Sequence, residues 1–294
     1  MKRGWTRWAG AAVALVFWCG SGAAATVQPD VPYVPTPPAV VDAMLKLADV
    51  RERDYVIDLG SGDGRILIAA AKRHGARGYG VEIDGDLVSA ARAEAQRQGV
   101  AGRVEFREEN LYITDFSRAS VMTLYLYPKL LMDLRPRFIA DLRPGSRIVS
   151  HDFDMDDWPP DARLTVPVPG KPYGPPHSEV FLWVVPENAA GAWRWRSEAG
   201  EVNLELNQAF QMLDGRGRVG QQEARVEQGR MRGAEIRFIL TSPGQGNAAR
   251  QEYSGRVNGD TIEGTMTAGG REAGWTATRI RRGSITMKMA TGDR

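Results

Sequence analysis

The feature that most constrains the fold of this 294-residue chain is the stretch YVIDLGSGDGR at Tyr55–Arg65. It begins as an apolar run, turns through three glycines at alternate positions, and continues at residues 66–71 as the apolar run ILIAAA. This order predicts a strand, a tight loop and a helix. Glycines permit positive φ angles and carry no Cβ, so a ligand can approach the backbone closely. The N–H groups at the start of the following helix point toward that ligand, and Asp58 at the end of the strand adds a carboxylate.

The spacing of these glycines differs from the spacing that is typical of dinucleotide-binding loops. The dinucleotide fingerprint is G-x-G-x-x-G, whereas here the third glycine comes one residue earlier and an acid precedes the first. The string DLGSGDG resembles motif I of the class I, seven-strand S-adenosylmethionine-dependent methyltransferases. The alternatives are nucleotide binding and a purely structural turn. The resemblance implies S-adenosyl-L-methionine as the cofactor, with these donor-binding positions: Asp58, Gly60, Ser61, Gly62 and Asp63.

The next expected strand, residues 78–82, also ends in an acid, Glu82. Ligands of α/β sheets lie beyond the carboxyl ends of the strands. A carboxylate there can accept hydrogen bonds from both ribose hydroxyls of the donor, and Ile83 and Asp84 would then lie beside the adenosine. A solvated acid at a strand end is the alternative.

Three polar residues follow the third expected strand, residues 104–107. In the methyltransferase fold an acid or amide at this position often binds the adenine amino group. Asn110 aligns best with that role and Glu109 next. A solvated turn is the alternative for both.

The acceptor side is expected after the fourth and fifth strands, residues 120–126 and 147–150. Tyr125 and Tyr127 follow the fourth strand, and aromatic faces of this kind attract alkylammonium groups. Because side chains alternate along a strand, both rings are expected to point the same way; core packing is the alternative. The pair His151-Asp152 follows the fifth strand and is a candidate base or substrate-orienting pair, or a satisfied strand-end histidine. Three histidines in the chain do not readily supply a metal site.

These segments predict an α/β fold, a Rossmann-like seven-strand sheet with helices on both faces, over residues 26–188. Helices are expected at residues 40–50, 66–74, 87–98 and 130–142, and the last two strands at residues 164–168 and 179–185. The loop at residues 169–177, PGKPYGPPH, is too rich in proline and glycine for regular structure. It is either a substrate-side flap or a long hairpin connection.

A proline-rich segment, TVQPDVPYVPTPP at residues 26–38, leads into this domain. Tyr33 and Thr36 are candidates to cap the donor pocket, with a plain linker as the alternative. The order of the lead-in PYVPTP, a VVxxML helix, the motif DLGSGDGRI and a G-x-E after the second strand resembles a narrower group, over roughly residues 30–155. This is the lysine methyltransferase group that modifies the c subunit of ATP synthase or the adenine nucleotide translocase. The resemblance implies a protein-lysine acceptor, Tyr33 as a cap, and membrane proteins among the candidate substrates.

The first 25 residues have the pattern of an export signal. Lys2, Arg3 and Arg7 precede an apolar run at residues 9–19, and the small residues AAA at 23–25 suggest cleavage before Thr26. We therefore expect an exported protein, periplasmic or secreted; an uncleaved anchor is the alternative. This segment holds three cations and no acid, so the formal charge of +2 becomes −1 without it, which gives no electrostatic case for nucleic acid.

The composition changes near Pro186 into short alternating segments with many glycines. This pattern predicts a small antiparallel sheet or barrel at residues 189–282. A weak internal sequence repeat indicates repeated hairpins: GRMRGAEI at residues 229–236 and GRVNGDTI at residues 255–262. The arginines of this half are either a solvated face or part of a module for substrate or partner, and residues 283–294 are expected to be frayed.

The predicted activity is direct methyl transfer from S-adenosylmethionine to an amine, most simply a protein lysine. A protein of another class is the first alternative, an exported binder of the donor or of a nucleoside that keeps the fold without turnover. A small-molecule or nucleic-acid methyltransferase is disfavoured, because the Asn-Pro-Pro-Tyr string of many amino-group methyltransferases is missing after the fourth strand.

Overall fold

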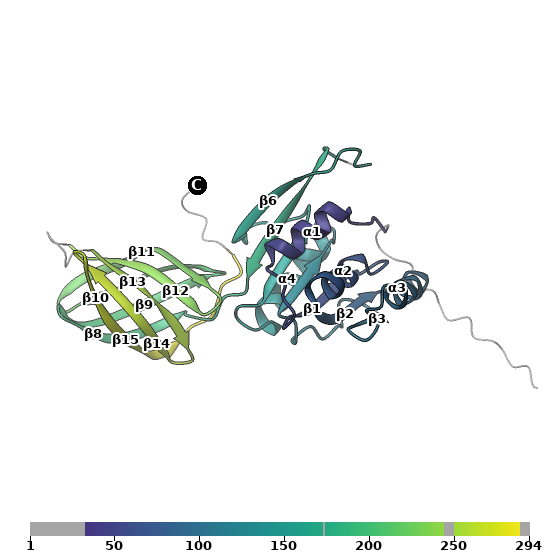
Figure 1. The fold of residues 1–294 in the computed structure, drawn as a ribbon. Coiled ribbons are helices and arrows are strands. Elements are labelled where there is room, and N and C mark those ends of the chain that lie inside the picture. The colour runs from purple at the N-terminus through teal and green to yellow at the C-terminus, as the bar shows by residue number, and fades with distance from the viewer. Residues whose placement is uncertain (1–32, 173, 244–249, 289–294) are drawn as a thin grey trace, which may run out of the picture.

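The structure, a computed structural model, describes residues 33–172, 174–243 and 250–288. Its first half is a seven-stranded sheet in the order β3-β2-β1-β4-β5-β7-β6 (Figure 1). Strands β1 to β5 run parallel, and β7 runs antiparallel between β5 and β6. The strands are β1 Tyr55–Leu59, β2 Arg77–Glu82, β3 Val104–Glu108, β4 Val121–Leu124, β5 Arg147–His151, β6 Ala162–Pro167 and β7 His177–Val184. The predicted Rossmann-like sheet of seven strands is confirmed.

Helices cover both faces of this sheet, as expected. They are α1 Pro38–Leu47, α2 Arg65–His74, α3 Gly85–Arg97 and α4 Pro128–Asp141. The first three share one apolar cluster on one face of the sheet, while α4 packs into a second cluster on the other face. Local sequence sets their ends: Asp84 accepts hydrogen bonds from two N–H groups at the start of α3, and Gly75 ends α2 at a φ of 72°. Strands β1 and β4 are neighbours although β2 and β3 lie between them in the chain, and this reversal of strand order opens a crevice at their carboxyl ends.

Strands β6 and β7 form a long hairpin that projects beyond the rest of the sheet (Figure 1). The last residue of β5, His151, pairs with Val180, whereas β7 begins three residues earlier, at His177, opposite Pro167. The proline-rich loop at residues 168–176 is therefore a hairpin connection at the edge of the sheet where the parallel strands end. Its Tyr173 lies outside the described residues.

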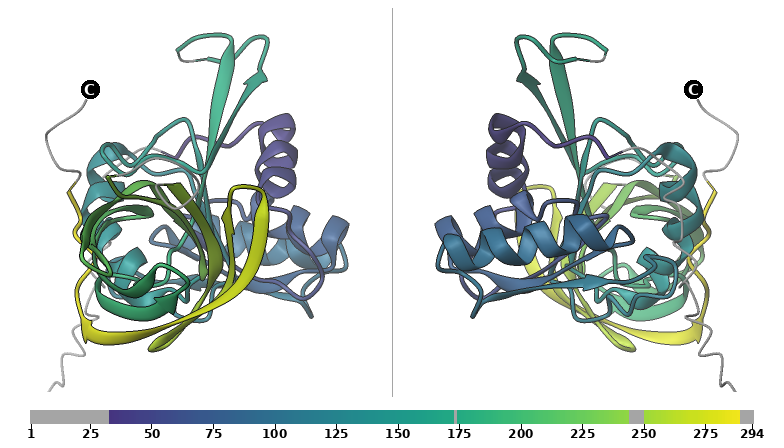
Figure 2. Two further views of the ribbon diagram at one scale, coloured as in Figure 1. Left: turned by 90° about the vertical axis from the view of Figure 1, so that its left-hand side faces the viewer. Right: turned by 90° about the vertical axis from the view of Figure 1, so that its right-hand side faces the viewer.

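The second half is a closed antiparallel barrel in the order β10-β11-β12-β13-β14-β15-β8-β9, seen end-on in Figure 2. It confirms the antiparallel β domain. Large side chains fill its interior, including Trp195, Phe238, Tyr253 and Trp275. The strands are β8 Gly191–Ser197, β9 Gly200–Ala209, β10 Met212–Val219, β11 Gln222–Arg232, β12 Glu235–Thr241, β13 Arg250–Asn258, β14 Thr261–Ala268 and β15 Arg271–Arg282.

The repeated sequence in this half corresponds to two equivalent hairpins. The first joins β11 to β12 and the second joins β13 to β14. Gly233 and Gly259 occupy the same position in their turns, with φ angles of 58° and 60°, a conformation that glycine adopts without strain. The prediction of repeated hairpins is thus confirmed.

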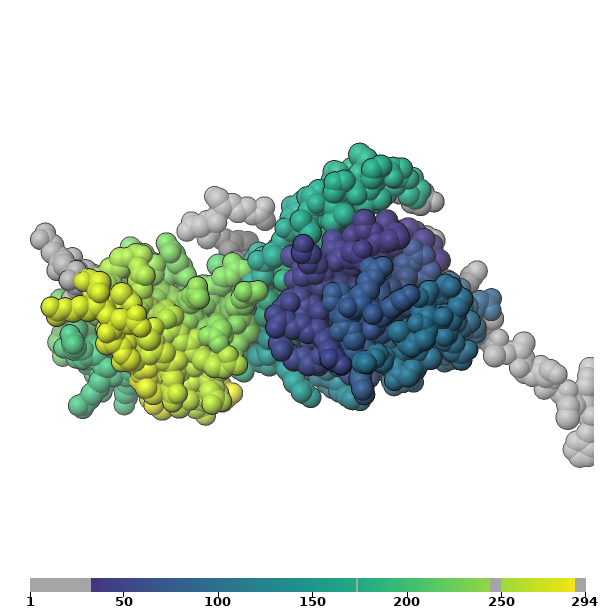
Figure 3. Space-filling model, viewed as in Figure 1, coloured from purple at the N-terminus to yellow at the C-terminus, as the bar shows by residue number. Residues whose placement is uncertain are grey.

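The barrel adjoins the sheet domain (Figure 3). The contact is on the face of the sheet that carries α4. Phe210 of the barrel is buried in the sheet domain's second cluster, where its ring stacks on Trp158 with centroids 5.2 Å apart. The guanidinium of Arg135 on α4 lies 5.1 Å from the Phe210 ring centroid, and Gln211 Nε2 donates to the Pro159 carbonyl at 2.5 Å. The barrel thereby covers part of the sheet-domain core.

The prediction of a frayed C-terminus is wrong for residues 283–288. The Thr286 N–H donates to Gln208 O at 2.8 Å, and the Met287 carbonyl accepts from Arg135 at 3.2 Å. These bonds attach residues 286 and 287 to both the barrel and α4. Residues 289–294 lie outside the described residues.

The expected export signal, residues 1–25, also lies outside the described residues. Within the part of the chain that the structure describes, the helices are too short or too polar to cross a membrane.

Candidate functional site

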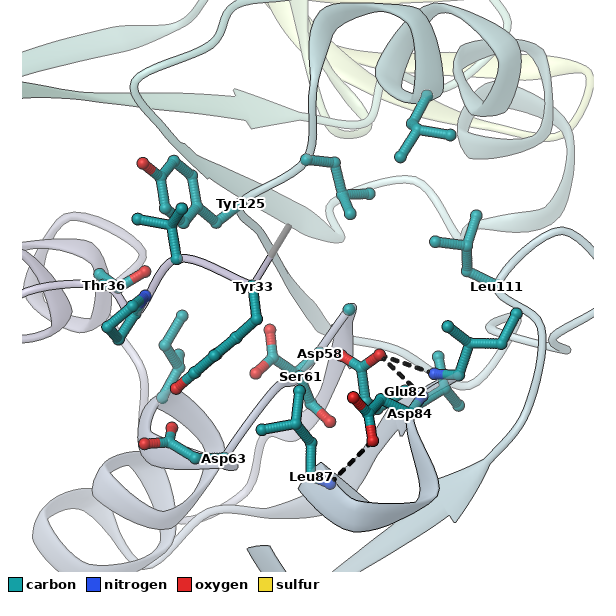
Figure 4. A pocket seen from close by; sticks show the side chains of 18 of the residues that line it. Tyr33, Thr36, Asp58, Ser61, Asp63, Glu82, Asp84, Leu87, Leu111 and Tyr125 are labelled. Atoms are coloured by element: carbon teal, nitrogen blue, oxygen red, sulfur yellow. Dashed lines mark hydrogen bonds between the residues drawn. The ribbon is translucent and has the colours of Figure 1, made fainter. Parts of the chain in front are cut away.

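A pocket lies at the carboxyl ends of β1, β2 and β4 and beneath the lead-in segment before α1 (Figure 4). It is walled on the inner side by apolar side chains, among them Leu87, Leu111, Leu126 and Leu130. Most residues predicted from the sequence as donor-binding meet here. Those that line the pocket are Tyr33, Asp58, Gly60, Ser61, Asp63, Glu82, Ile83, Asp84 and Asn110.

Asp58 is the most unusual group in the pocket, because it is a buried carboxylate with one unsatisfied oxygen. The Thr123 hydroxyl donates to its Oδ1 at 2.6 Å, and its Oδ2 has no hydrogen-bond partner among the described residues. Burial raises the pKa of Asp58 to about 7; the Thr123 hydrogen bond acts against this rise, and the charges of Glu82 and Asp63 add to it. An unpaired buried oxygen costs stability, so a cationic partner fits this position.

The glycine turn brings the backbone close to the cover of the pocket. Gly60 and Gly62 have φ angles of 73° and 53°. A Cβ on Gly62 would lie 2.3 Å from Cε2 of Tyr33, so only glycine allows the Tyr33 ring to lie over the turn. The Ser61 hydroxyl is buried here without a hydrogen-bond partner in the described part of the chain. Gly62 contacts the site through its backbone, since its N–H donates to Glu82 Oε2 at 3.0 Å.

Glu82 is held in place by the backbone around it. Besides the Gly62 bond, its Oε1 accepts from the N–H groups of Ile83 at 2.8 Å and Asp84 at 3.1 Å (Figure 4). A carboxylate has about four acceptor positions, so Glu82 retains capacity for hydroxyl donors of a ligand. Asp84 uses its own Oδ1 to accept from Asp86 and Leu87 at the start of α3.

Asn110 and Glu109 reach the pocket on the side of β3. The side-chain carbonyl of Asn110 accepts from the Tyr112 N–H at 2.9 Å and so fixes the turn. The position agrees with the one that the sequence suggested for an adenine contact, and that role stays a prediction.

Arg65, which the sequence reasoning did not single out, ties the lead-in segment to the glycine turn. It forms an ion pair with Asp63 at 2.6 Å and donates to the Thr36 carbonyl at 3.0 Å. Nη2, the nitrogen that pairs with Asp63, also lies 3.5 Å from the Tyr33 hydroxyl. The available signal was its place at the start of the helix, directly after the three glycines.

The residues predicted for the acceptor side separate in the structure. Tyr125 lines the pocket. Tyr127 lies directly before α4, is 43% exposed and stacks on Phe153 with centroids 5.7 Å apart. Strand β4 ends at Leu124, so strand alternation does not set the directions of the two rings, but both stack on Phe153.

His151 and Asp152 do not line the pocket. His151 is fully buried behind Tyr125, with its ring centroid 3.9 Å away, and both of its nitrogens are bonded to hydroxyl groups. Burial lowers the pKa of His151 to about 4, with Asp152 opposing this change and Lys171 adding to it. Asp152 is engaged with Lys171 Nζ at 2.5 Å. A base that faces the substrate at His151 does not fit this geometry.

Comparisons with known proteins agree with this geometry. The ANTKMT methyltransferase domain family matches residues 58–162. A protein-lysine N-methyltransferase of Saccharolobus islandicus is 39% identical over 161 residues, which cover 54% of this chain and 97% of that protein. The human lysine N-methyltransferase of the ATP synthase c subunit is 33% identical over 44% of this chain and 55% of its own length.

The chain thus spans about half the length of the human relative, while it covers nearly all of the archaeal one. A solved structure described as an RNA methyltransferase from Salinibacter ruber, in complex with S-adenosyl-L-homocysteine, is 53% identical. The match covers 52% of the present chain and 95% of the Salinibacter ruber chain, with a TM-score of 0.48.

The pocket suits S-adenosylmethionine in its charge as well as in its place in the fold. The unpaired Asp58 oxygen fits the ammonium of the donor's amino-acid end, and the glycine turn leaves its backbone free of side chains. The fixed Glu82 carboxylate lies at the end of the neighbouring strand, where the ribose is expected. The fold, the pocket and an archaeal relative matched over nearly its whole length lead to one conclusion. The chain belongs to the class I S-adenosylmethionine-dependent methyltransferases, in the family of protein-lysine N-methyltransferases.

Proposed function

We propose that this methyltransferase acts on the Nζ atom of a lysine in a protein. One observation carries the proposal: the 39% identical relative, matched over 97% of its length, is a protein-lysine N-methyltransferase. The pocket supports it, because apolar side chains and one tyrosine surround the side on which the acceptor is expected.

When bound, S-adenosylmethionine supplies a methyl carbon on a positively charged sulfur. The lysine lone pair forms the new N–C bond as the C–S bond breaks, and the electron pair of that bond stays on sulfur, which becomes neutral. The chain's own contribution is to hold the two reactants in line and away from water. Asp58 and Glu82 fix the donor through its charge and its ribose.

The lysine must arrive without its proton, and the pocket favours the neutral amine. Leu126 and Leu130 form an apolar wall beside Tyr125, and an apolar environment disfavours the charged form of an amine. Burial raises the pKa of Tyr125 to about 12, with the charges of Asp152 and Tyr127 adding to the rise. The phenol therefore stays neutral at pH 7 and offers a hydroxyl as a hydrogen-bond partner.

The proposed acceptor is a membrane protein. Relatives that resemble this chain are named for the c subunit of ATP synthase and for the adenine nucleotide translocase. The surface near the pocket supports an apolar partner, since Tyr112 is 39% exposed and the adjacent Ile113 is 79% exposed.

The proposal includes export through residues 1–25, supported by their basic, apolar and small-residue regions. Cell fractionation and the N-terminal sequence of the purified protein test it. A mature chain that begins at Thr26 in the exported fraction is expected, while a chain that keeps Met1 in the membrane fraction indicates an uncleaved anchor.

Export also motivates the alternative, a donor-binding protein without turnover, because no adenylate pool is expected outside the cytoplasm. The full chain with a labelled methyl donor, incubated with isolated membranes, the purified c subunit of ATP synthase and total RNA, separates the possibilities. Label on protein, found by mass spectrometry as Nε-methyl-lysine and absent with Asp58→Ala, is the expected result. Label on RNA alone contradicts the lysine proposal, and donor binding without transfer to any acceptor favours the binder.

A further inference from the structure

A column of four aromatic rings runs from the interior of the sheet domain to its surface. The His151 imidazole lies 3.9 Å from the Tyr125 ring, centroid to centroid, with an interplanar angle of 31°. Phe153 lies 6.2 Å from Tyr125 at 20° and 5.7 Å from Tyr127 at 26°. The inner tyrosine lines the pocket and the outer one is 43% exposed, so the column connects the pocket with solvent.

The inner end of this column is fixed by segments that are distant in the sequence. His151 Nδ1 is 3.2 Å from the Thr36 hydroxyl, in the lead-in segment, and its Nε2 is 2.9 Å from the Ser178 hydroxyl on β7. All three residues are buried. Nε2 also lies 3.4 Å from Asp152 Oδ2, whose charge is paired with Lys171 Nζ at 2.5 Å. Hydroxyls can donate or accept, so a neutral imidazole satisfies both hydroxyl bonds without bringing a positive charge to the pocket.

We propose that Tyr125, Phe153 and Tyr127 form the wall along which the acceptor lysine enters, and that His151 is the positioning residue that holds the innermost ring. This inference rests on the proposed lysine methylation and concerns the same site. Aromatic faces bind both the methylene stem and the ammonium of a lysine. A charged imidazole behind Tyr125 would repel that ammonium, whereas the neutral one does not.

The wall is tested with single substitutions and with poly-L-lysine as the acceptor. Phe153→Ala and Tyr127→Ala are expected to raise KM for poly-L-lysine by about fivefold each, the scale of one cation–aromatic contact, with little change in kcat. The matched control is Leu164→Ala, which shortens another half-exposed apolar side chain, 41% exposed on β6. Unchanged KM in both aromatic variants contradicts the wall.

The role of His151 is tested by two variants that separate its ring from its hydrogen bonds. His151→Phe keeps a ring against Tyr125 and loses both polar bonds, while His151→Gln keeps a donor and an acceptor and loses the ring. If the ring positions Tyr125, the Gln variant shows the larger KM for poly-L-lysine even where the Phe variant unfolds at the lower temperature. If His151 only supports the fold, KM follows the melting temperature, and the proposal fails.

Two controls keep this inference separate from the proposed function. The Kd of S-adenosylhomocysteine, measured by calorimetry on each full-length variant, shows whether the donor site is intact. If the wild-type chain transfers methyl groups to neither poly-L-lysine nor any protein lysine, the proposed function fails. If it does so and the aromatic variants keep the wild-type KM, the proposed function stands and the wall and its positioning residue do not.

Discussion

The donor pocket of the sheet domain and the aromatic interior of the barrel differ in how their buried polar atoms are satisfied. In the sheet domain, Asp58 Oδ2 and Ser61 Oγ are buried in the pocket without hydrogen-bond partners from residues 33–172, 174–243 or 250–288. In the barrel, the large interior side chains bond to one another: Trp195 Nε1 donates to the Tyr253 hydroxyl at 3.3 Å, which donates to Gln251 Oε1 at 2.7 Å. The pocket thus leaves two polar atoms for a ligand, whereas these interior groups of the barrel satisfy one another.

The barrel interior has the features of a packed core and not of a binding site. Eight-strand barrels either fill their interior with side chains or hold one small ligand. Here the rings of Phe238 and Tyr253 stack 4.9 Å apart, and Trp275 lies 4.8 Å from Tyr253. The interior is thus a packed core. Unsatisfied buried atoms cost stability. Among the described residues five side-chain atoms are of this kind: Asp58 Oδ2 and Ser61 Oγ share the donor pocket, whereas Trp158 Nε1, Gln211 Oε1 and Arg279 Nε lie outside it.

The strongest test of this comparison uses two buried aspartates at opposite ends of β1: Asp58, near its carboxyl end, and Asp54, directly before it. Asp58→Asn is expected to weaken donor binding by about a hundredfold or more, the effect of removing one partner of a buried charge pair. The same change should raise the free energy of unfolding of the donor-free protein, because it removes an unpaired buried carboxylate. Calorimetry with S-adenosylmethionine and urea unfolding measure the two effects.

Asp54 is the matched control for this test. It is buried at the other end of β1, and Arg147, the Ser120 hydroxyl and the Arg51 N–H satisfy it. Asp54→Asn should lower the free energy of unfolding and leave the Kd of the donor unchanged. Equal effects of the two substitutions would refute the distinction between an unpaired and a paired buried acid.

The next largest effect concerns the contact between the halves. Phe210→Ala is expected to cost about 3 kcal/mol of stability or more, the usual range for a buried phenylalanine, and to split thermal unfolding into two transitions. Leu204→Ala, inside the barrel, removes core volume without touching α4 and should keep a single transition if the halves unfold together. Differential scanning calorimetry decides. A single transition in the Phe210 variant would mean that other contacts couple the halves.

A third effect is the pH dependence of the donor site. Because burial raises the pKa of Asp58 to about 7 from an unfolded value near 4, Asp58 stabilises the donor-free fold below pH 4. That contribution is lost as the pH rises through 7. Donor binding needs the carboxylate, so its Kd should rise by up to about tenfold per pH unit below 7. Titration calorimetry from pH 5 to 8 measures the slope, which should vanish in Asp58→Asn.

The smallest expected effect is at the cover of the pocket. Gly62→Ala places a Cβ against the Tyr33 ring at a positive φ, which costs about 1 kcal/mol of stability and displaces the ring. Donor affinity should fall about fivefold, as one contact is lost. Gly99→Ala, at a φ of 73° with open space around it, is the control for backbone strain alone. Equal donor affinity in the two variants would show that Tyr33 does not cover the donor.

Which features of the site can be predicted from the sequence depends on how far apart the interacting residues are along the chain. The turn at residues 60–64 and the acid at Glu82 follow from local spacing, and both lie where the sequence placed them. The burial of His151 does not follow from local spacing: its Nε2 does lie 3.4 Å from the adjacent Asp152 Oδ2, but its two hydroxyl partners are 115 and 27 residues away along the chain. Its pairing with Asp152 in the sequence suggested a base, but only the tertiary packing shows that it is buried.

The barrel too is predictable from the sequence only in its local features. Alternation and glycine turns predict its strands and hairpins, but no local pattern shows that β8 pairs with both β9 and β15 and closes the sheet. Nor does the local sequence around Phe210, between β9 and β10, indicate that its ring is buried in the core of the sheet domain. Register between distant strands and contacts between domains depend on the whole chain.

The chain enters and leaves the barrel at one place. Gly283 N–H donates to Ala190 O at 2.9 Å, and residues 286 and 287 bind the barrel and α4. The segments that precede β8 and follow β15 are therefore fastened to each other at the same end of the barrel. A protease cut within residues 185–190 alone would leave the barrel held to the sheet domain by the packing of Phe210 and by the Met287 carbonyl, which accepts from Arg135 on α4.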